Sequence, residues 1–467
     1  MNNRRSFLRK LLLSLPAGYV LPSVLSSCET QDDLFPNLSF GGKVIVVGAG
    51  AAGLHAAYIL HKNGVDVQVL EATNRVGGRI KALDEFTGYP LELGADHVRG
   101  VNSVFYDAVR ISNFEYYQDR GKTYYQLTGK IIEESEANSN TSFRAASKVI
   151  EKLPLYSGPD ISLSDYLDKE PLSDESLTLL NSFIANEFGT DLDLLSVAGY
   201  NEALAKRTSG NEKIILRRRS FSEVLDIQYS PISSKIRQNT PIKSIDYSSG
   251  KVVLTDDANQ TYEADKVIVT VPLPILKEGR ISFSPALPEE KLLAMDGIGM
   301  DASVKIFMRF GQNFWGDETS TVYPGGIIPV YKAPGWGKRS EFDDDLIFFN
   351  NVLVGEANGS AGATLSELGN DAVAYALRDL DEMFNGQATK FLTQSYVMDW
   401  SKDTFTKGAY SYPKVGSEGA REILASAIDN KIYFAGEATH NEGHFGTVHG
   451  AMETGYRAAY EILKSIS

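Results

Sequence analysis

Three glycines near the start of the chain have a spacing that gives them a chemical use. Gly48, Gly50 and Gly53 follow the pattern GxGxxG directly after the apolar run 43–47. In such a turn the first glycine allows a sharp bend, the second lets backbone N–H groups come close to a ligand, and the third lets the next helix pack on the strand. The N-terminus of that helix also offers unpaired N–H groups and the positive end of its dipole. The turn therefore suits the phosphates of a dinucleotide.

The segments around the glycines predict a complete strand–helix–strand unit. We expect a strand over residues 43–47, a helix over 54–62 and a second strand over 65–70 that ends at Glu71. An acid in this position accepts hydrogen bonds from the ribose hydroxyls of an adenosine. A GxGxxG match alone is weak, but this order of strand, glycines, helix, strand and acid predicts a dinucleotide site.

The residues after Glu71 indicate which dinucleotide is bound. The run EATNRVGGRI contains Thr73, Gly78 and Arg79, and its pattern E-A-x-x-R-V-G-G-R resembles the flavin amine oxidase family, which includes monoamine, polyamine and L-amino-acid oxidases. The resemblance implies FAD rather than NAD as the cofactor, and it implies a charge-assisted contact between Arg79 and the phosphates. The alternative interpretation of the glycine pair at 77–78 is a flexible turn.

Later segments carry the same resemblance. The run PLELGA at 90–95 resembles the segment that passes beneath the flavin ring in the family, and the run 431–460 resembles the last FAD-binding segment. The helix expected from 446–448 onward would turn its N-terminal N–H groups toward the flavin, and its small residues Gly450, Ala451 and Gly455 are expected to pack against the nucleotide-binding strands. The cofactor-binding residues that follow are Gly48, Gly50, Ala52, Gly53, Glu71, Thr73, Gly78, Arg79, Gly94, Ala95, Ile242, Trp400, Gly436, Glu437, Thr447 and Val448.

The resemblance assigns catalytic roles to Lys305 and Tyr410. The family keeps a lysine at the position of Lys305 that reaches flavin N5 through a water, whereas a lysine in a strand most often lies on a solvated face. Tyr410 matches the first of two tyrosines that hold the amine in monoamine oxidases, and Thr447 stands where the second would be, as in polyamine-type relatives. In monoamine oxidases the residue before the first tyrosine is a cysteine that is bonded covalently to the flavin. In this chain that residue is Ala409. Because Cys28 is the only cysteine, we expect FAD to be held noncovalently.

Arg99 and His97 are candidate residues of the substrate pocket, and they leave the substrate class open. Polyamine oxidases usually carry an acid or a histidine at the position of Arg99. A fixed cation there would repel a polyamine and attract a carboxylate. Amino-acid oxidases and tryptophan monooxygenases carry an arginine where this chain has His97. Two interpretations of Arg99 are therefore equally supported. It could bind an anionic or amino-acid substrate, or it could only brace the domain junction.

The predicted reaction is oxidation of an amine to an imine, which water hydrolyses to a carbonyl compound, with oxygen reduced to hydrogen peroxide. The alternatives are an L-amino-acid oxidase or tryptophan 2-monooxygenase-like enzyme, a C–C desaturase or porphyrinogen-type oxidase on the same fold, and a non-catalytic flavoprotein. His440, His444 and His449 match no closed zinc pattern, so no metal is predicted. The net charge of −14 argues against nucleic acid as a partner. The expected partners are therefore a small amine or amino acid and oxygen.

The first 28 residues have the order of an export signal. Arg4-Arg5 with the following Phe7-Leu8 resembles a twin-arginine motif, and the apolar stretch 11–25 is too short and too interrupted by prolines for a spanning helix. Leu25-Ser26-Ser27-Cys28 resembles a bacterial lipobox. Lipidation of Cys28 would make the protein a periplasmic or cell-envelope lipoprotein that meets the membrane through its N-terminal lipid. The alternative is an ordinary cysteine near the chain end.

The expected fold class is α/β. A Rossmann-like FAD-binding domain would be interleaved with a substrate domain that contains a mixed sheet and helices. The residues 101–207 are expected to be largely helical and to cover the substrate cavity. The expected ranges are a signal at 1–28, a linker at 29–41, the FAD-binding domain at 42–100, 208–280 and 396–467, and the substrate domain at 101–207 and 281–395.

Overall fold

A parallel five-stranded sheet carries the glycine turn, and its strand order is β10-β2-β1-β14-β23. β1 (Lys43–Val47) lies between β2 (Asp66–Leu70) and β14 (Lys266–Val269). β10 (Ile236–Arg237) and β23 (Ile432–Phe434) are the outer strands. The valines and isoleucine of β1 are buried on both faces, as a central parallel strand requires.

The computed structural model describes residues 40–337 and 350–466. The predicted export signal, its lipidation site Cys28 and nearly all of the predicted linker lie outside the described residues, so they stay predictions. Within the described ranges, no helix is both long enough and apolar enough to cross a membrane.

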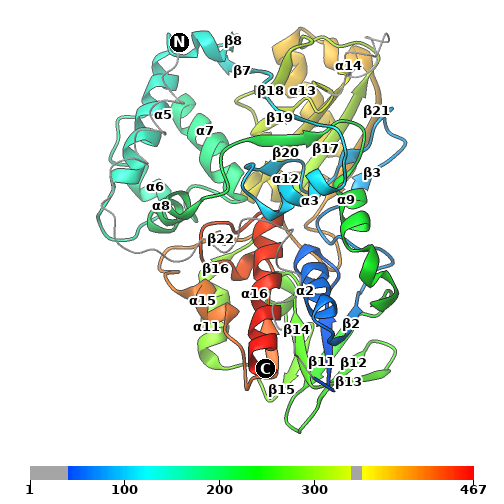
Figure 1. Cartoon of the computed structure of the whole chain (residues 1–467). Helices are drawn as coiled ribbons and strands as arrows, with labels where there is room; N and C mark the ends of the chain where they lie inside the picture. The colour runs from blue at the N-terminus through cyan, green and yellow to red at the C-terminus, as the bar shows by residue number, and fades with distance from the viewer. Residues whose placement is uncertain (1–39, 338–349, 467) are drawn as a thin grey trace. The chain divides into compact units, whose positions relative to one another are not determined.

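Two helices, α2 (Ala51–Lys62) and α16 (Val448–Ile466), pack on one face of this sheet and on each other (Figure 1). α2 begins three residues earlier than expected because the glycine turn leads directly into its first turn. A Cβ on Gly53 would lie 2.0 Å from the carbonyl oxygen of Gly48. The close helix–strand packing predicted for Gly53 is therefore confirmed.

Two glycines of α16 allow close contacts, one with a neighbouring helix and one with the loop that precedes α16. A Cβ on Gly455 would lie 2.2 Å from the carbonyl oxygen of Ala52 in the first turn of α2, and a Cβ on Gly450 would lie 2.0 Å from the carbonyl oxygen of His444. The prediction that these glycines face the strands was therefore wrong. Because α2 and α16 cover the same face of the sheet, Gly455 packs between the two helices, whereas Gly450 packs against the loop that precedes α16.

The opposite face of the parallel sheet is covered by a second sheet, with strand order β13-β12-β11-β15. Ile45 of β1 belongs to the same buried cluster as Ile245 and Leu254 of this second sheet. Its neighbours Val44 and Val46 pack toward the helices instead, because side chains alternate between the two faces of a strand. The four strands are β11 (Ile242–Asp246), β12 (Val252–Asp256), β13 (Thr261–Ala264) and β15 (Ser282–Ser284).

A mixed seven-stranded sheet forms the other half of the described structure, with order β21-β17-β20-β19-β18-β7-β8. β18 and β7 run parallel, whereas the other neighbouring pairs run antiparallel. α12 (Gly359–Leu368) and α13 (Ala372–Phe384) pack against it. The strands are β7 (Lys122–Leu127), β8 (Lys130–Glu133), β17 (Ser303–Phe310), β18 (Thr319–Tyr323), β19 (Val330–Lys332), β20 (Val352–Asn358) and β21 (Leu392–Asp399).

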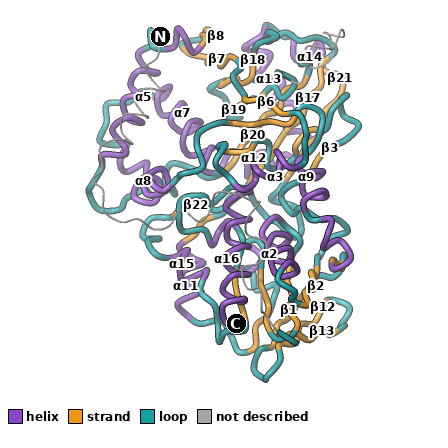
Figure 2. The backbone as a smooth tube through the Cα atoms, in the orientation of Figure 1, coloured by secondary structure: helices purple, strands orange, loops and turns teal. Residues whose placement is uncertain are grey.

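The prediction that residues 101–207 are largely helical was wrong for residues 116–133. This stretch forms β6 (Tyr116–Gln118), β7 and β8, because its repeated tyrosines favour strands. The following residues are helical, as Figure 2 shows for the region beside β7. The α-helices described within residues 101–207 are α3 (Val104–Ile111), which precedes these strands, and α4 (Glu134–Ala137), α5 (Thr141–Lys152), α6 (Leu163–Leu167), α7 (Asp174–Leu180) and α8 (Val197–Lys206), which follow them.

Two expected domain boundaries fall within packed elements. The expected ranges place β15 and α11 (Glu289–Gly297) in the substrate domain, but β15 pairs with β11 and α11 packs on α15 (Ala420–Ala425). β21 crosses the expected boundary at residue 396. The domain ranges stay a prediction. The remaining described elements include β3 (Ala82–Leu83), β4 (Leu91–Glu92), β5 (Val98–Arg99), β9 (Lys213–Leu216), α9 (Phe221–Gln228), α10 (Leu273–Lys277), β16 (Ile298–Gly299), α14 (Gln387–Phe391) and β22 (Tyr412–Pro413).

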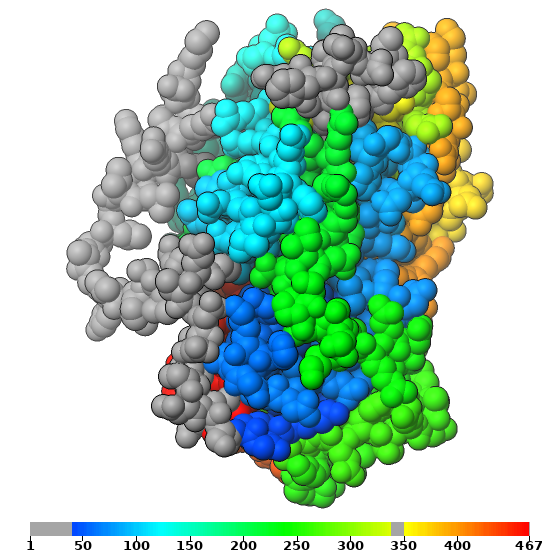
Figure 3. Space-filling model, turned by 45° about the vertical axis from the view of Figure 1, so that its right-hand side comes forward, coloured from blue at the N-terminus to red at the C-terminus, as the bar shows by residue number. Residues whose placement is uncertain are grey.

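The fold class is the predicted α/β arrangement of a nucleotide-binding half and a half with a mixed sheet. Each half is assembled from segments that are far apart in the sequence. In the space-filling view, the blue residues of the first strand–helix–strand unit lie directly against green residues from the middle of the chain (Figure 3). The site must therefore be built by contacts between distant segments.

Candidate cofactor and substrate site

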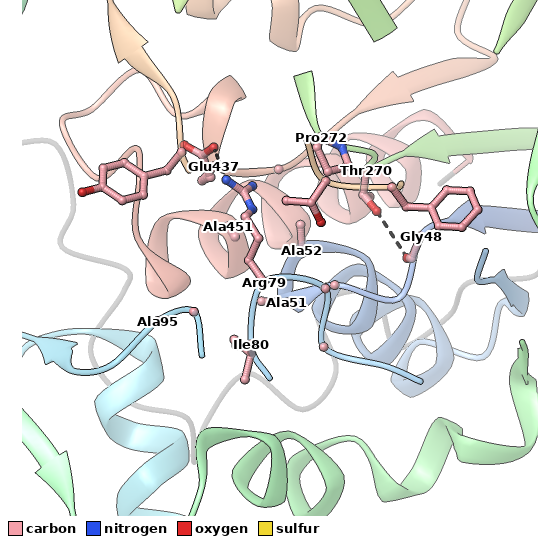
Figure 4. A pocket seen from close by; sticks show the side chains of 18 of the residues that line it. Gly48, Ala51, Ala52, Arg79, Ile80, Ala95, Thr270, Pro272, Glu437 and Ala451 are labelled. Atoms are coloured by element: carbon pink, nitrogen blue, oxygen red, sulfur yellow. Dashed lines mark hydrogen bonds and ion pairs between the residues drawn. The ribbon is translucent and has the colours of Figure 1, made fainter. Parts of the chain in front are cut away.

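A large cavity lies between the carboxyl ends of the parallel strands and the seven-stranded sheet (Figure 4). Open parallel sheets bind ligands at this edge. Of the predicted cofactor residues, Gly53 packs within the fold and does not line the cavity, whereas the others do. The predicted residues Lys305, Tyr410, Arg99 and His97 line the same cavity.

The glycine turn leaves open space beside the start of α2. No heavy atom lies within 4 Å of the position that a Cβ on Gly50 would take. Gly48 and Gly436 have φ of +105° and +122°, which non-glycine residues rarely adopt. The first N–H groups of a helix have no partner within the helix, so the N-terminus of α2 faces this space with unpaired donors. The cavity fits the pyrophosphate of a dinucleotide here.

Glu71 is fixed against the glycine turn. Its side chain is 8% exposed, and its Oε2 accepts a hydrogen bond of 2.7 Å from the backbone N–H of Ala49. Its Oε1 accepts bonds of 2.9 and 2.8 Å from the backbone N–H and the hydroxyl of Thr73. Each carboxylate oxygen has two lone pairs, so acceptor capacity is left for a ribose. The ribose contact of Glu71 stays a prediction.

Arg79 and Glu437 form an ion pair on the cavity wall (Figure 4). Arg79 Nη1 donates to Glu437 Oε1 and to the carbonyl oxygen of Ala409, both at 3.0 Å. Glu437 Oε2 accepts from the backbone N–H of Gly446 at 2.7 Å. Burial acts to raise the pKa of Glu437, but Arg79 and Arg421 outweigh it and hold the pKa below its usual range. The pair ties three distant segments together, and the predicted phosphate contact of Arg79 stays a prediction.

Lys305 belongs to a cluster of two lysines and two carboxylates. It is 5% exposed in β17, and its Nζ donates to the carbonyl oxygen of Gly94 at 2.7 Å and to Asp96 Oδ2 at 3.1 Å. Glu356 Oε2 lies 3.6 Å from the same Nζ. Lys332 Nζ donates to Asp96 Oδ2 and to Glu356 Oε2, both at 2.8 Å. The ammonium of Lys305 is therefore buried among charges and not on a solvated face.

The opposite charges of this cluster favour the ionised forms of Asp96, Glu356 and Lys332. Burial acts to raise the pKa values of Asp96 and Glu356, but Lys305 and Lys332 hold both values below the usual range. Burial acts to lower the pKa of Lys332, but Asp96 and Glu356 raise it well above its usual value. With two positive and two negative charges, the cluster is neutral overall. It presents fixed charges to the cavity without a net charge.

Arg99 forms an ion pair with Glu187, whose Oε1 accepts from Arg99 Nη2. Glu187 lies in the short 3-10 helix Asn186–Phe188 that continues α7. A carboxylate from a distant segment therefore compensates the charge of Arg99, and both interpretations of this residue, substrate contact and brace, stay predictions. Burial acts to raise the pKa of Glu187, but Arg99 and then Lys213 hold it below its usual range. The pair joins β5 to the helical segment, as a brace does.

Tyr410 is fixed at both its hydroxyl and its ring. The hydroxyl donates to the backbone oxygen of Glu187 at 2.8 Å. A Cβ on Gly189 or on Gly446 would lie 3.0 Å from a carbon of the ring. Thr447 also uses its hydroxyl within the chain, because it donates to the carbonyl oxygen of His444 at 2.6 Å. Tyr410 therefore has one defined position on the cavity wall.

Residues 51–463 match the family model described as flavin containing amine oxidoreductase. The chain belongs to this family. FAD is accordingly its cofactor, and the cavity between α2, Glu71 and α16 fits it.

Relatives of known name support the same assignment. Lysine-specific histone demethylase 2 of Homo sapiens is 30% identical over 484 residues, which cover 95% of this chain and 56% of the relative. Probable polyamine oxidase 4 of Arabidopsis thaliana is 29% identical, with 97% of this chain and 91% of the relative covered. The chain thus spans about half the length of its demethylase relative and nearly the whole length of the polyamine oxidase.

The solved structure of wild-type putrescine oxidase bound to putrescine superimposes with a TM-score of 0.77. The match covers 91% of this chain and 99% of that chain at 20% sequence identity. At this identity the likeness shows the fold alone, which is that of a flavin amine oxidoreductase.

In this flavin amine oxidoreductase, His440, His444 and Glu453 are close enough together to hold a metal ion. Glu453 Oε2 lies 2.7 Å from His440 Nε2 and 2.8 Å from His444 Nδ1. The second nitrogen of each ring accepts from the backbone, His440 Nδ1 from Glu442 and His444 Nε2 from Thr208. A neutral imidazole that accepts at one nitrogen donates at the other, so both rings donate to Glu453. Neither ring therefore has a free nitrogen lone pair with which to bind a metal. That the protein binds no metal stays a prediction.

Several charged residues of the cavity wall were missed by sequence reasoning. Glu356 carried a usable signal, because an acid inside the apolar strand VLVGEAN indicates a buried partner. Asp96 lies between Ala95 and His97, which were both predicted as site residues. Glu187 and Lys332 lie in segments with no motif, and His449 was considered only as a metal ligand. The missed residues that line the cavity include Asp96, Glu187, Lys332, Glu356 and His449.

A substitution at Gly189 tests whether the position of Tyr410 matters. Gly189 and Gly64 have φ of +77° and +76°, so alanine costs about 1–2 kcal/mol of backbone strain at either position. Around Gly64 there is no atom within 4 Å, whereas at Gly189 the new methyl group would displace the Tyr410 ring. We expect Gly189→Ala to slow reduction of the flavin by an amine roughly tenfold, and Gly64→Ala to leave this rate unchanged. Equal rates in stopped-flow measurements of the two variants would show that the ring position is irrelevant.

Proposed function

We propose that this chain is an FAD-dependent amine oxidase. It would take two hydrogens from an amine R–CH2–NH2 to give the imine R–CH=NH, and oxygen would take them to give hydrogen peroxide. Water would then convert the imine to the aldehyde and ammonia. The observation that carries the proposal is that Lys305 and Tyr410 line the same cavity as the glycine turn and Glu71.

The residues that would hold FAD lie at two ends of this cavity. The glycine turn, the start of α2 and Glu71 suit the pyrophosphate and the adenosine. Gly436, Glu437 and the start of α16 suit the flavin end. When bound, FAD accepts the two electrons that leave the amine.

The chain's own residues would orient the amine and control charge around it. Tyr410 offers a ring held in one position, and the cluster around Lys305 offers fixed charges that sum to zero. The N-terminus of α16 adds partial positive charge to the wall, and preorganised donors of this kind stabilise negative charge that develops during a reaction. The neutral form of an amine is favoured when its ammonium loses water inside such a cavity.

The substrate class best supported is an amine without a carboxylate. The guanidinium of Arg99 is already paired with Glu187, so its charge is compensated and does not call for a carboxylate on the substrate. Polyamine oxidase and putrescine oxidase are among the named relatives and solved structures, which supports aliphatic amines. An L-amino-acid oxidase or a C–C oxidase has no comparable support from these similarities.

Anaerobic reduction of the flavin tests the proposal. The purified holoenzyme is mixed without oxygen with benzylamine, putrescine, spermidine or L-leucine, and the visible flavin band is followed. We expect at least one of the three amines to bleach the band and L-leucine to leave it. Dithionite serves as the control that the flavin can be reduced. A flavin that dithionite bleaches and no amine bleaches would contradict the proposal.

We further propose that the protein is exported and anchored to the cell envelope by lipid on Cys28. The support is the order of Arg4-Arg5, the apolar stretch 11–25 and Leu25-Ser26-Ser27-Cys28 in the sequence. A folded export route would allow FAD to be bound before export.

Metabolic labelling tests the anchor. In bacterial cells fed labelled palmitate, the wild-type chain should take up the label and fractionate with membranes. Cys28→Ser should remain unlabelled and appear in the soluble fraction, because no other residue of the chain is a cysteine. The variant Arg4→Lys/Arg5→Lys should keep the unprocessed length. Equal labelling of wild type and Cys28→Ser would contradict the anchor.

A further inference from the structure

Lys332 has an unusual position for a residue without an assigned role. Its ammonium lies on the wall of the cofactor cavity and is shared between Asp96 Oδ2 and Glu356 Oε2, at 2.8 Å from each. Its side chain is 26% exposed, whereas that of Lys305 is 6% exposed. Lys332 thus has the more exposed of the two lysine side chains that line the cavity.

Lys332 binds carboxylate oxygens of Asp96 and Glu356 that would otherwise be free to bind Lys305. The ammonium of Lys305 has three N–H donors, and two of them go to the carbonyl oxygen of Gly94 and to Asp96. Glu356 Oε2 lies 3.6 Å from Lys305 but 2.8 Å from Lys332, so the nearer lysine holds it. The third N–H of Lys305 therefore makes no hydrogen bond to Glu356, because 3.6 Å is too long for one.

The net charge of the cluster also depends on Lys332. Without it, Asp96 and Glu356 would share one ammonium, and the wall would carry one net negative charge. Asp96 is also tied to His97, whose Nδ1 lies 2.6 Å from Asp96 Oδ1. Buried charges act over long distances, since a unit charge at an effective dielectric of about 20 still changes an equilibrium about tenfold at about 12 Å.

We propose that Lys332 is a positioning residue that sets the charge of the cavity wall, so that the bound FAD is reduced more readily and the third N–H of Lys305 stays directed into the cavity. Reduction brings negative charge onto the flavin, and a wall that carries its own net negative charge opposes it. Lys332 acts through Asp96, Glu356 and Lys305 and needs no contact with the substrate. The role rests on the proposed function for its use in catalysis, but it is measurable without any substrate.

The midpoint potential of the bound flavin tests the proposal. Three variants of the holoenzyme are expected to differ in the direction in which this potential shifts. Lys332→Met should lower the equilibrium constant for flavin reduction about tenfold, which is about 30 mV toward negative potential for a two-electron couple. Glu356→Gln leaves one extra positive charge and should shift the potential in the opposite direction. The double variant Lys332→Met/Glu356→Gln is neutral again and should return to within about threefold of wild type.

A purely structural role for Lys332 predicts another outcome. In that case Lys332→Met and Glu356→Gln would shift the potential in the same direction or leave it unchanged, and either result would overturn the proposal. Lys332→Arg keeps the charge and should stay near the wild-type potential even where Lys332→Met binds FAD poorly. Opposite shifts in a protein that no amine reduces would uphold this role and contradict the amine oxidase proposal instead.

Discussion

A buried ammonium group must stay close to carboxylates, and this constraint governs the centre of the molecule. Taking a charge out of water costs several kcal/mol unless it is paired. Lys305 meets the requirement with Asp96 and Glu356, and these two acids meet it with Lys305 and Lys332. Asp96 lies between β4 and β5, whereas the other three residues lie in the seven-stranded sheet. The pairing therefore joins the segment between β4 and β5 to three strands of that sheet.

The same principle shapes the rest of the cavity wall. Glu437 is 4% exposed and stays ionised beside Arg79 and Arg421, while Arg99 and Glu187 pair between β5 and the helical segment. Each pair links segments that are far apart in the sequence. The cavity can thus be lined with charge, and the segments around it are held together by the groups that line it.

Local patterns in the sequence were enough to predict the nucleotide-binding part. The glycine turn, Glu71 and the start of α16 are each defined by a few consecutive residues, and the structure places them on one cavity. The ion pairs could not be predicted in this way, because Lys332, Glu356 and Glu187 gain their meaning from strand pairing and helix packing. Gly455 illustrates the same limit: its small size was recognised, but its contact with α2 depends on how two helices share one face. The strands at 116–133 were missed because their tyrosines stand in adjacent pairs, at 116–117 and 124–125, and do not alternate with polar residues.

The chemistry expected of this site requires noncovalent FAD in the cavity between Glu71 and Ala409. Denaturing the purified protein and separating chain from small molecules measures this. We expect one FAD to be released for each chain, because Ala409 stands where a covalent cysteine would be and Cys28 is the chain's only thiol. A protein that carries no flavin, or a flavin that stays bonded to the denatured chain, would contradict it.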